Sequence, residues 1–117
     1  MTESVSIPHP LPDALVELIA QRFRVIGEPM RIRVLDALRD GPLTINELTE
    51  ALGASQQNVS KHVGVLAQAG IVGREKDGNR VRCFIADESV FDLCELVCGG
   101  LRKQLAELDQ LLSGGTA

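Results

Sequence analysis

The sequence predicts a mainly helical fold with a single β-hairpin, and two stretches carry this prediction. Residues 55–70, SQQNVSKHVGVLAQAG, place apolar side chains at three- and four-residue spacing, which is the pattern of an amphipathic helix. Residues 71–86 contain two β-prone runs around Asp77-Gly78-Asn79, a strong signal for a hairpin turn. With 117 residues, of which 44% are hydrophobic, the chain has the length of one domain with a small core.

Two helices are expected before residue 44. The first covers 13–26, with Asp13 as its N-cap residue and five apolar side chains on one stripe. The second starts at Pro29, whose missing N–H is not needed in a first helical turn, and stops before Gly41-Pro42. Three of its side chains should face inward: Ile32, Leu35 and Leu38.

A third, short helix is expected over about 45–52. Thr44 and Glu47 stand at the spacing of a capping box, in which each side chain accepts a hydrogen bond from the other residue's N–H group. Only Gly53-Ala54 separate this helix from Ser55, the N-cap residue of the next one. Two helices joined by so tight a turn form a helix-turn-helix, with residues 55–70 as its second, recognition helix.

The polar residues of this stretch point to nucleic acid. The recognition helix carries short or flexible donors and acceptors with one positive charge, a surface that can touch base edges and phosphates, although a merely solvated face has the same composition. The hairpin that follows is basic near its tip, which completes a winged helix. Residues 55–86 hold five basic and two acidic side chains, although the net charge of the chain is −4. Such a local basic patch favours phosphate binding.

The last helix is expected over 87–112, with Asp87 as its cap. Its apolar stripe is longer than a domain of this size can cover, because 26 residues of helix span roughly 39 Å. Part of the stripe should therefore pair with the same helix of a second copy. Gly99-Gly100 interrupt it, either for close backbone approach or as a kink. We expect one domain over 13–112, a flexible tail at 1–12 and a frayed end at 113–117.

The order of these elements resembles the ArsR/SmtB family of bacterial repressors. The likeness rests on GEPMRIRVLDAL, on LTINELTEALGASQQNVSKHVGVLAQAGIV with its run S-Q-x-x-V-S-x-H, and on REKDGNRVRCFI. It implies a homodimeric winged-helix repressor that an inducer releases from operator DNA. By position, the recognition helix and the wing should contact DNA through Ser55, Gln56, Gln57, Ser60, Lys61, Arg74, Lys76, Asn79 and Arg80. The spacing of His62 from Val59 and Leu66 favours half-buried packing instead.

The resemblance also implies that the first and last helices form the dimer interface. The apolar residues expected there are Leu15, Leu18, Ile19, Leu93, Val97, Leu101, Leu105 and Leu108.

The inducer site departs from well-known members of the family. Arsenical sensors often carry two cysteines where this chain has Thr44-Ile45-Asn46-Glu47-Leu48. Zinc sensors carry four Asp, His or Glu ligands on the last helix; Asp87 fits the first position, but Ser89, Gly100 and Lys103 occupy the others.

Cys94 and Cys98 offer a different candidate site for the inducer. Their i, i+4 spacing places both thiols on one helix face, about 5–6 Å apart at Cβ. Such a pair can bind a soft metal or metalloid ion, or react with a reactive sulfur species. The alternative is that both are small packing residues of the dimer interface, in which case the regulator senses neither metal nor thiol chemistry. Cys83 would add a third thiol only if the fold brings it near.

Other classes of protein are disfavoured. No nucleophile–base pair or metalloenzyme spacing occurs, and His9 and His62 are the only histidines, so we do not expect an enzyme. The absence of a secretory signal and of a long apolar run, with an odd number of cysteines, favours a cytoplasmic protein without membrane contact. The remaining rival is a protein-interaction module that kept the winged helix but lost DNA binding.

Overall fold

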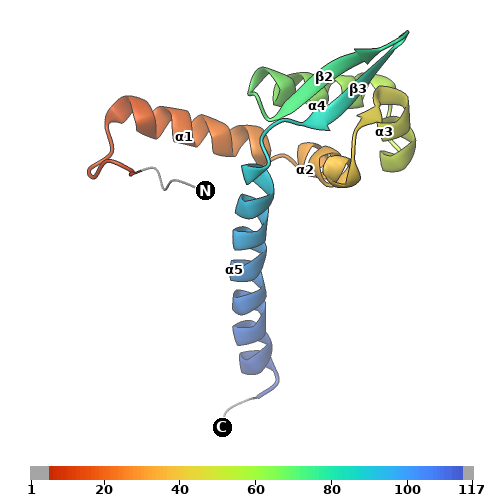
Figure 1. The fold of residues 1–117 in the computed structure, drawn as a ribbon. Helices are drawn as coiled ribbons and strands as arrows, with labels where there is room; N and C mark the ends of the chain where they lie inside the picture. Colours follow the sequence, from red (N-terminus) through yellow and green to blue (C-terminus); the bar gives the residue numbers. More distant parts are fainter. Residues whose placement is uncertain (1–5, 115–117) are drawn as a thin grey trace. The chain divides into compact units, whose positions relative to one another are not determined.

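The computed structural model describes residues 6–114, which divide into two compact units (Figure 1). One unit extends to Ala86 and the other begins at Asp87. The single domain that we expect over 13–112 is not tested by this division and stays a prediction. The expected tails at 1–12 and 113–117 extend into residues 1–5 and 115–117, which lie outside the described residues.

The first unit contains four helices, a 3-10 turn and a small sheet. In chain order they are α1 (Asp13–Ile26), α2 (Pro29–Ala37), η1 (Leu38–Asp40), β1 (Leu43–Thr44), α3 (Ile45–Leu52), α4 (Gln56–Gln68), β2 (Val72–Asp77) and β3 (Arg80–Ile85). The second unit contains α5 (Ser89–Leu112). The mainly helical winged-helix fold is confirmed.

The bounds of α1 agree with the prediction, but its cap does not. Pro12 holds the N-cap position, and its carbonyl accepts hydrogen bonds from the N–H groups of Leu15 and Val16, each at 3.0 Å. Asp13 is therefore the first residue inside the helix and not its cap. Its carboxylate still lies at the positive end of the helix dipole.

The second helix is shorter than predicted. It ends at Ala37 and continues as the 3-10 turn η1, and its cap is the carboxylate of Glu28, which accepts from the Met30 N–H. The inward placement of Ile32 is wrong, because that side chain is 44% exposed whereas Leu35 and Leu38 are buried. Apolar residues three apart drift around a helix of 3.6 residues per turn, so the first member leaves the buried face.

The helix-turn-helix has the predicted local chemistry. The Glu47 N–H donates to Thr44 Oγ1 at 3.1 Å, and the Thr44 N–H donates to Glu47 Oε1 at 2.8 Å, which confirms the capping box. Gly53 ends α3 with φ +62°, a left-handed conformation that few other residues adopt cheaply. Ser55 Oγ then accepts from the Asn58 N–H at 3.1 Å, and α4 begins.

The sheet has one strand more than predicted. Its order is β1-β3-β2, and both pairings are antiparallel. The two-residue strand β1 pairs Leu43 with Cys83 and is too short to leave a pattern in the sequence. Asp77 pairs with Arg80, so Gly78 and Asn79 alone form the turn at the tip of the wing.

The core of the first unit forms where one face of α4 meets α2, α3 and the base of the hairpin. The side chains that are at most 2% exposed there come from every one of these elements. They are Val34, Leu35, Leu38, Leu48, Val59, Val63, Leu66, Ile71, Val72 and Cys83.

The second unit is the single helix α5, which starts two residues later than predicted. Asp87 Oδ1 accepts from the Ser89 N–H at 3.0 Å, so this carboxylate caps the helix from outside it. The helix runs without a break through Gly99 and Gly100, where an added Cβ would meet no described atom within 4 Å. Neither α5 nor another described helix is long and apolar enough to cross a membrane.

Gly73 gives a test of the packing at the base of the wing. A Cβ at this position would lie 2.3 Å from Phe84 Cζ, on the paired strand, so Gly73→Ala must push the ring off the sheet. We expect the variant to lose about 1–3 kcal/mol of unfolding free energy, as overpacked sites do, in urea titrations. Gly64→Ala is the matched control, because a Cβ on this residue of α4 meets nothing within 4 Å. It should gain up to about 1 kcal/mol.

Candidate nucleic-acid interface

The helix α4 has one buried and one exposed face. Val59, Val63 and Leu66 are at most 1% exposed and hold the helix on the body of the unit. The five residues of this region that we predicted to contact DNA all lie on the exposed side: Ser55, Gln56, Gln57, Ser60 and Lys61. The fold thus gathers them at the start of α4 and leaves them free to contact a ligand.

The wing sorts its charges between its two faces. Cross-strand partners share a face, so Glu75 lies opposite Arg82, and Asp77 opposite Arg80. Arg82 Nε also lies 3.1 Å from Asp77 Oδ2. On the other face, Arg74 and Lys76 lie opposite the uncharged Cys83 and Val81. Among the described residues, the cross-strand partners of Arg74 and Lys76 carry no negative charge.

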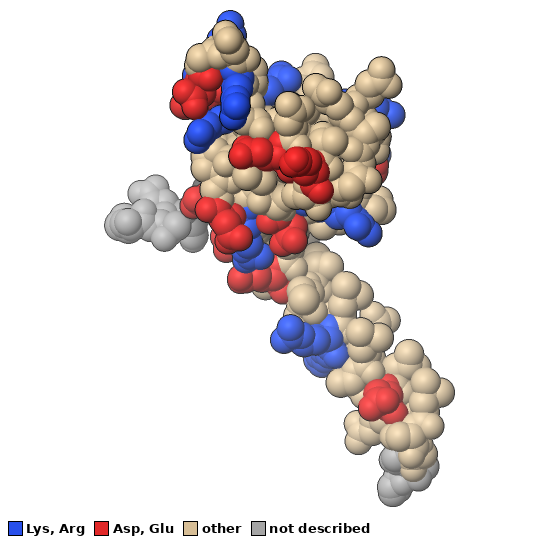
Figure 2. Space-filling view, turned by 90° about the vertical axis from the view of Figure 1, so that its right-hand side faces the viewer, with Lys and Arg blue, Asp and Glu red and all other residues tan. Residues whose placement is uncertain are grey.

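The charged surface follows this arrangement. In Figure 2, Lys and Arg side chains crowd the lobe at the top where the hairpin ends, with acidic side chains on the same lobe and on the body below it. A hollow of about 520 Å³ separates the tip of the hairpin from α3 and the first residue of α4. Gln56, Asn79 and Arg80 line it together with Glu47 and Glu50. The basic surface is therefore bordered by carboxylates.

Glu47 is the titratable group of this border with the clearest perturbation. The hydrogen bonds from the backbone and side chain of Thr44 hold the pKa of the Glu47 carboxyl below its ordinary value, and the nearby Arg82 and Arg80 charges lower the pKa further. The ionised carboxylate is thus part of the cap of α3.

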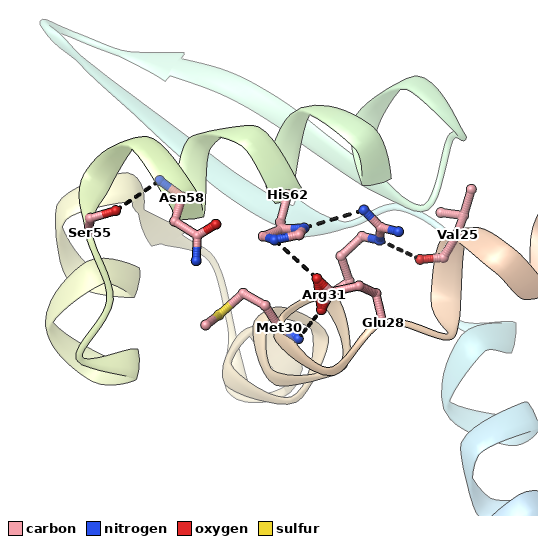
Figure 3. Close-up of polar contacts among 7 residues, drawn as sticks. All are labelled: Val25, Glu28, Met30, Arg31, Ser55, Asn58 and His62. Atoms are coloured by element: carbon pink, nitrogen blue, oxygen red, sulfur yellow. Dashed lines mark hydrogen bonds and ion pairs between the residues drawn. The ribbon is translucent and has the colours of Figure 1, made fainter.

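A polar cluster surrounds His62. The sequence predicts that this side chain packs half-buried, but it does not predict the polar partners. This side chain is only 6% exposed, and its Nε2 lies 3.2 Å from Glu28 Oε2 while its Nδ1 lies 3.3 Å from Arg31 Nη1 (Figure 3). Arg31 Nε donates to the Val25 carbonyl at 2.6 Å. The sequence signals only one member of the cluster: Glu28 precedes Pro29, and an acceptor side chain before a helix-starting proline is placed to cap that helix.

The three thiols have different surroundings. Cys83 is buried, and this burial raises the pKa of its thiol, so the reactive thiolate is disfavoured. Cys94 is half-buried and Cys98 is exposed, both on α5. Within residues 6–114, no group of three or more His, Cys, Asp or Glu side chains could hold a metal ion.

Both helices that we predicted for the dimer interface expose apolar side chains. On α5, Val97, Leu101, Leu105 and Leu108 are between 49% and 62% exposed, and on α1 Leu18 and Ile19 are exposed as well. Leu15 and Leu93 are half-buried. Exposed apolar patches on a helix mark sites of protein association.

A helix-turn-helix whose second helix exposes polar side chains, followed by a basic hairpin, defines a winged-helix DNA-binding regulator. Residues 26–74 match the family model described as a helix-turn-helix domain. The uncharacterized HTH-type transcriptional regulator Rv0081 of Mycobacterium tuberculosis is 31% identical over 110 residues, covering 90% of this chain and 96% of that protein. Its crystal structure matches with a TM-score of 0.74 over 82% of this chain and 97% of that one, at 30% identity.

Two further relatives agree with this class. The HTH-type transcriptional regulator KmtR of M. tuberculosis is 35% identical over 74% of this chain, which spans 66% of that protein's length. A probable mercury resistance operon repressor of Streptomyces lividans is 33% identical over 81% of this chain and 71% of its own length. The chain belongs to the ArsR/SmtB family of transcriptional regulators and is not an enzyme. As a helix-turn-helix transcriptional regulator, the chain has DNA as its partner.

The cap of α3 predicts a dependence of stability on pH. Because the folded-state pKa of Glu47 lies below the ordinary 4.5, its ionised form adds stability above pH 4.5 that is lost as the pH falls through the lower folded value. Glu47→Gln should therefore be less stable than the wild type at pH 7, with the difference vanishing in acid, by urea titration at several pH values. Glu50→Gln is the matched control, because it removes one negative charge from the same helix and leaves the capping box in place. A difference for Glu47→Gln that stays constant down to pH 3 would contradict the assignment.

Proposed function

We propose that this regulator is a repressor that binds operator DNA in the cytoplasm through α4 and the wing, and that an inducer acting at Cys94 and Cys98 releases it. The observation that carries the DNA-binding part is the division of α4 into a buried apolar face and an exposed polar face. Gln57 and Ser60 would contact base edges, because short side chains with both donors and acceptors suit this task.

The wing would supply contacts to the phosphates. Arg74 and Lys76 share one face of the hairpin, and Arg80 at its tip lines the same hollow as Gln56 of α4. We assign phosphate contacts to these three positive side chains. Asn79 in the turn would add a hydrogen bond. These contacts would position the protein without reading sequence.

The dimer would form through α1 and α5. The exposed leucine and valine row of α5 and the exposed apolar residues of α1 each support this assignment. An interface of this composition resembles the cut core of a domain, as is usual for permanent homodimers.

The inducer in this proposal is a soft metal ion, a metalloid ion or a reactive sulfur species. Two thiols one helical turn apart on α5, one exposed and one half-buried, support it, as does the relative named as a mercury resistance operon repressor. A ligand across the two thiols would bend or rotate the helix that forms the dimer. A coupling of about 1–3 kcal/mol is enough to release a repressor.

Two substitutions separate base contacts from phosphate contacts. Gln57→Ala should weaken binding to the operator by about 1–3 kcal/mol and leave binding to random DNA nearly unchanged. Arg80→Ala should weaken binding to operator and to random DNA, and reduce the slope of log K against log salt by about one.

Fluorescence anisotropy with the protein's own promoter and a scrambled duplex measures the effects of the two substitutions. Arg24→Ala removes the same charge from α1 and should leave the slope unchanged.

Equal losses of Gln57→Ala on both duplexes would place that residue away from the bases. An unchanged slope for Arg80→Ala would remove this arginine from the interface. Absence of any salt-sensitive specific complex would instead favour a protein-interaction module.

The proposal predicts that the three thiols differ in reactivity and that thiol-binding compounds change operator affinity. In the native protein, Cys94 and Cys98 should react with a thiol reagent while Cys83 reacts only after unfolding, because it is buried and its pKa is raised. Arsenite or a persulfide donor should lower operator affinity by about 5–150-fold, and zinc should do less. The variant with Cys94→Ser and Cys98→Ser should bind the operator normally and respond to neither compound.

If both cysteines of α5 react only after unfolding and none of these compounds changes operator affinity, the thiols are packing residues. The chain would then be a winged-helix regulator without metal or thiol sensing at this place.

A further inference from the structure

The partners of His62 determine which form its imidazole ring takes. A guanidinium group has only donors, so His62 Nδ1, which faces Arg31 Nη1, must be the unprotonated acceptor. The proton is therefore on Nε2, which donates to Glu28 Oε2. Each nitrogen of the ring thus has a partner from the start of α2 (Figure 3).

Both partners are themselves fixed to the backbone. The other carboxylate oxygen of Glu28 accepts from the Met30 N–H and caps α2, and Arg31 holds the Val25 carbonyl in the last turn of α1. His62 on α4 is thus bonded directly to two residues at the start of α2, and through Arg31 it is connected to the end of α1. Hydrogen bonds are directional, so these contacts fix the orientation of α4 relative to α1 and α2.

The apolar contacts of α4 do not by themselves fix the orientation of the helix. Burial of Val59, Val63 and Leu66 holds the helix against the unit, but the hydrophobic effect is non-directional and resists a small rotation or slide only weakly. Hydrogen bonds to base edges, in contrast, weaken steeply outside donor–acceptor distances of about 2.7–3.2 Å. A recognition helix therefore needs a directional contact that sets its position.

We propose that His62 is a positioning residue for DNA binding: through Glu28 and Arg31 it fixes the rotation and height of α4 on the α1–α2 junction. The ring contacts no base in this arrangement, since it lies on the buried side of α4 while Gln57, Ser60 and Lys61 are exposed. Its loss should lower operator affinity of the folded protein more than it lowers stability.

The test compares His62→Leu with Val63→Ala, its neighbour on the buried side of α4. Operator and random-DNA affinities are measured well below the melting temperature of each variant, so that unfolded chains do not contribute. We expect His62→Leu to weaken operator binding about 10-fold and random-DNA binding much less. Val63→Ala should lower the melting temperature because it leaves a cavity, yet keep operator affinity within about twofold.

A conservative substitution of His62 should restore part of the operator affinity. In His62→Gln an amide N–H can still reach Glu28, so operator affinity should recover in part, and this recovery should vanish when Glu28→Ala is added. Long-range proton–nitrogen NMR spectra of the wild type should show the Nε2–H form of the ring.

Operator affinity of His62→Leu within about twofold of the wild type, or a ring protonated at Nδ1, would overturn the proposal. If His62→Leu does not fold, His62→Gln and Glu28→Ala carry the same comparison, and a fall in melting temperature without loss of operator affinity in both would show a purely structural role.

Discussion

Burial of one face of α4 is the constraint on which the rest of the first unit depends. Val59, Val63 and Leu66 are almost completely removed from water, and full burial of such side chains stabilises a fold by about 1.5–3 kcal/mol each. Because the residues of a helix divide between faces by their spacing, this burial also determines which residues remain outside. The exposure of Gln57, Ser60 and Lys61 is thus a consequence of how the core is packed.

Features with local causes could be predicted from the sequence. The capping box of Thr44 and Glu47, the left-handed Gly53 and the turn at Gly78 each depend on residues within a few positions of one another. The same holds for the polar face of α4, which follows from helical spacing alone.

Features that depend on distant residues could not be predicted. The strand β1 exists because Leu43 meets Cys83, forty positions along the chain, and two residues leave no periodic signal. The bonds from Glu28 and Arg31 to His62 join residues about thirty positions apart, so the role of that ring in the site was invisible beforehand.

The turn at the tip of the wing has a consequence for the entropy of binding. Only Gly78 and Asn79 connect the two strands, and the residues on either side of them, Asp77 and Arg80, are already paired. A hairpin closed so tightly has little backbone freedom to lose when it meets DNA. Since ordering of loops is one of the main penalties of association, the wing is an arm whose shape is set before the encounter, and its side chains alone remain to be immobilised.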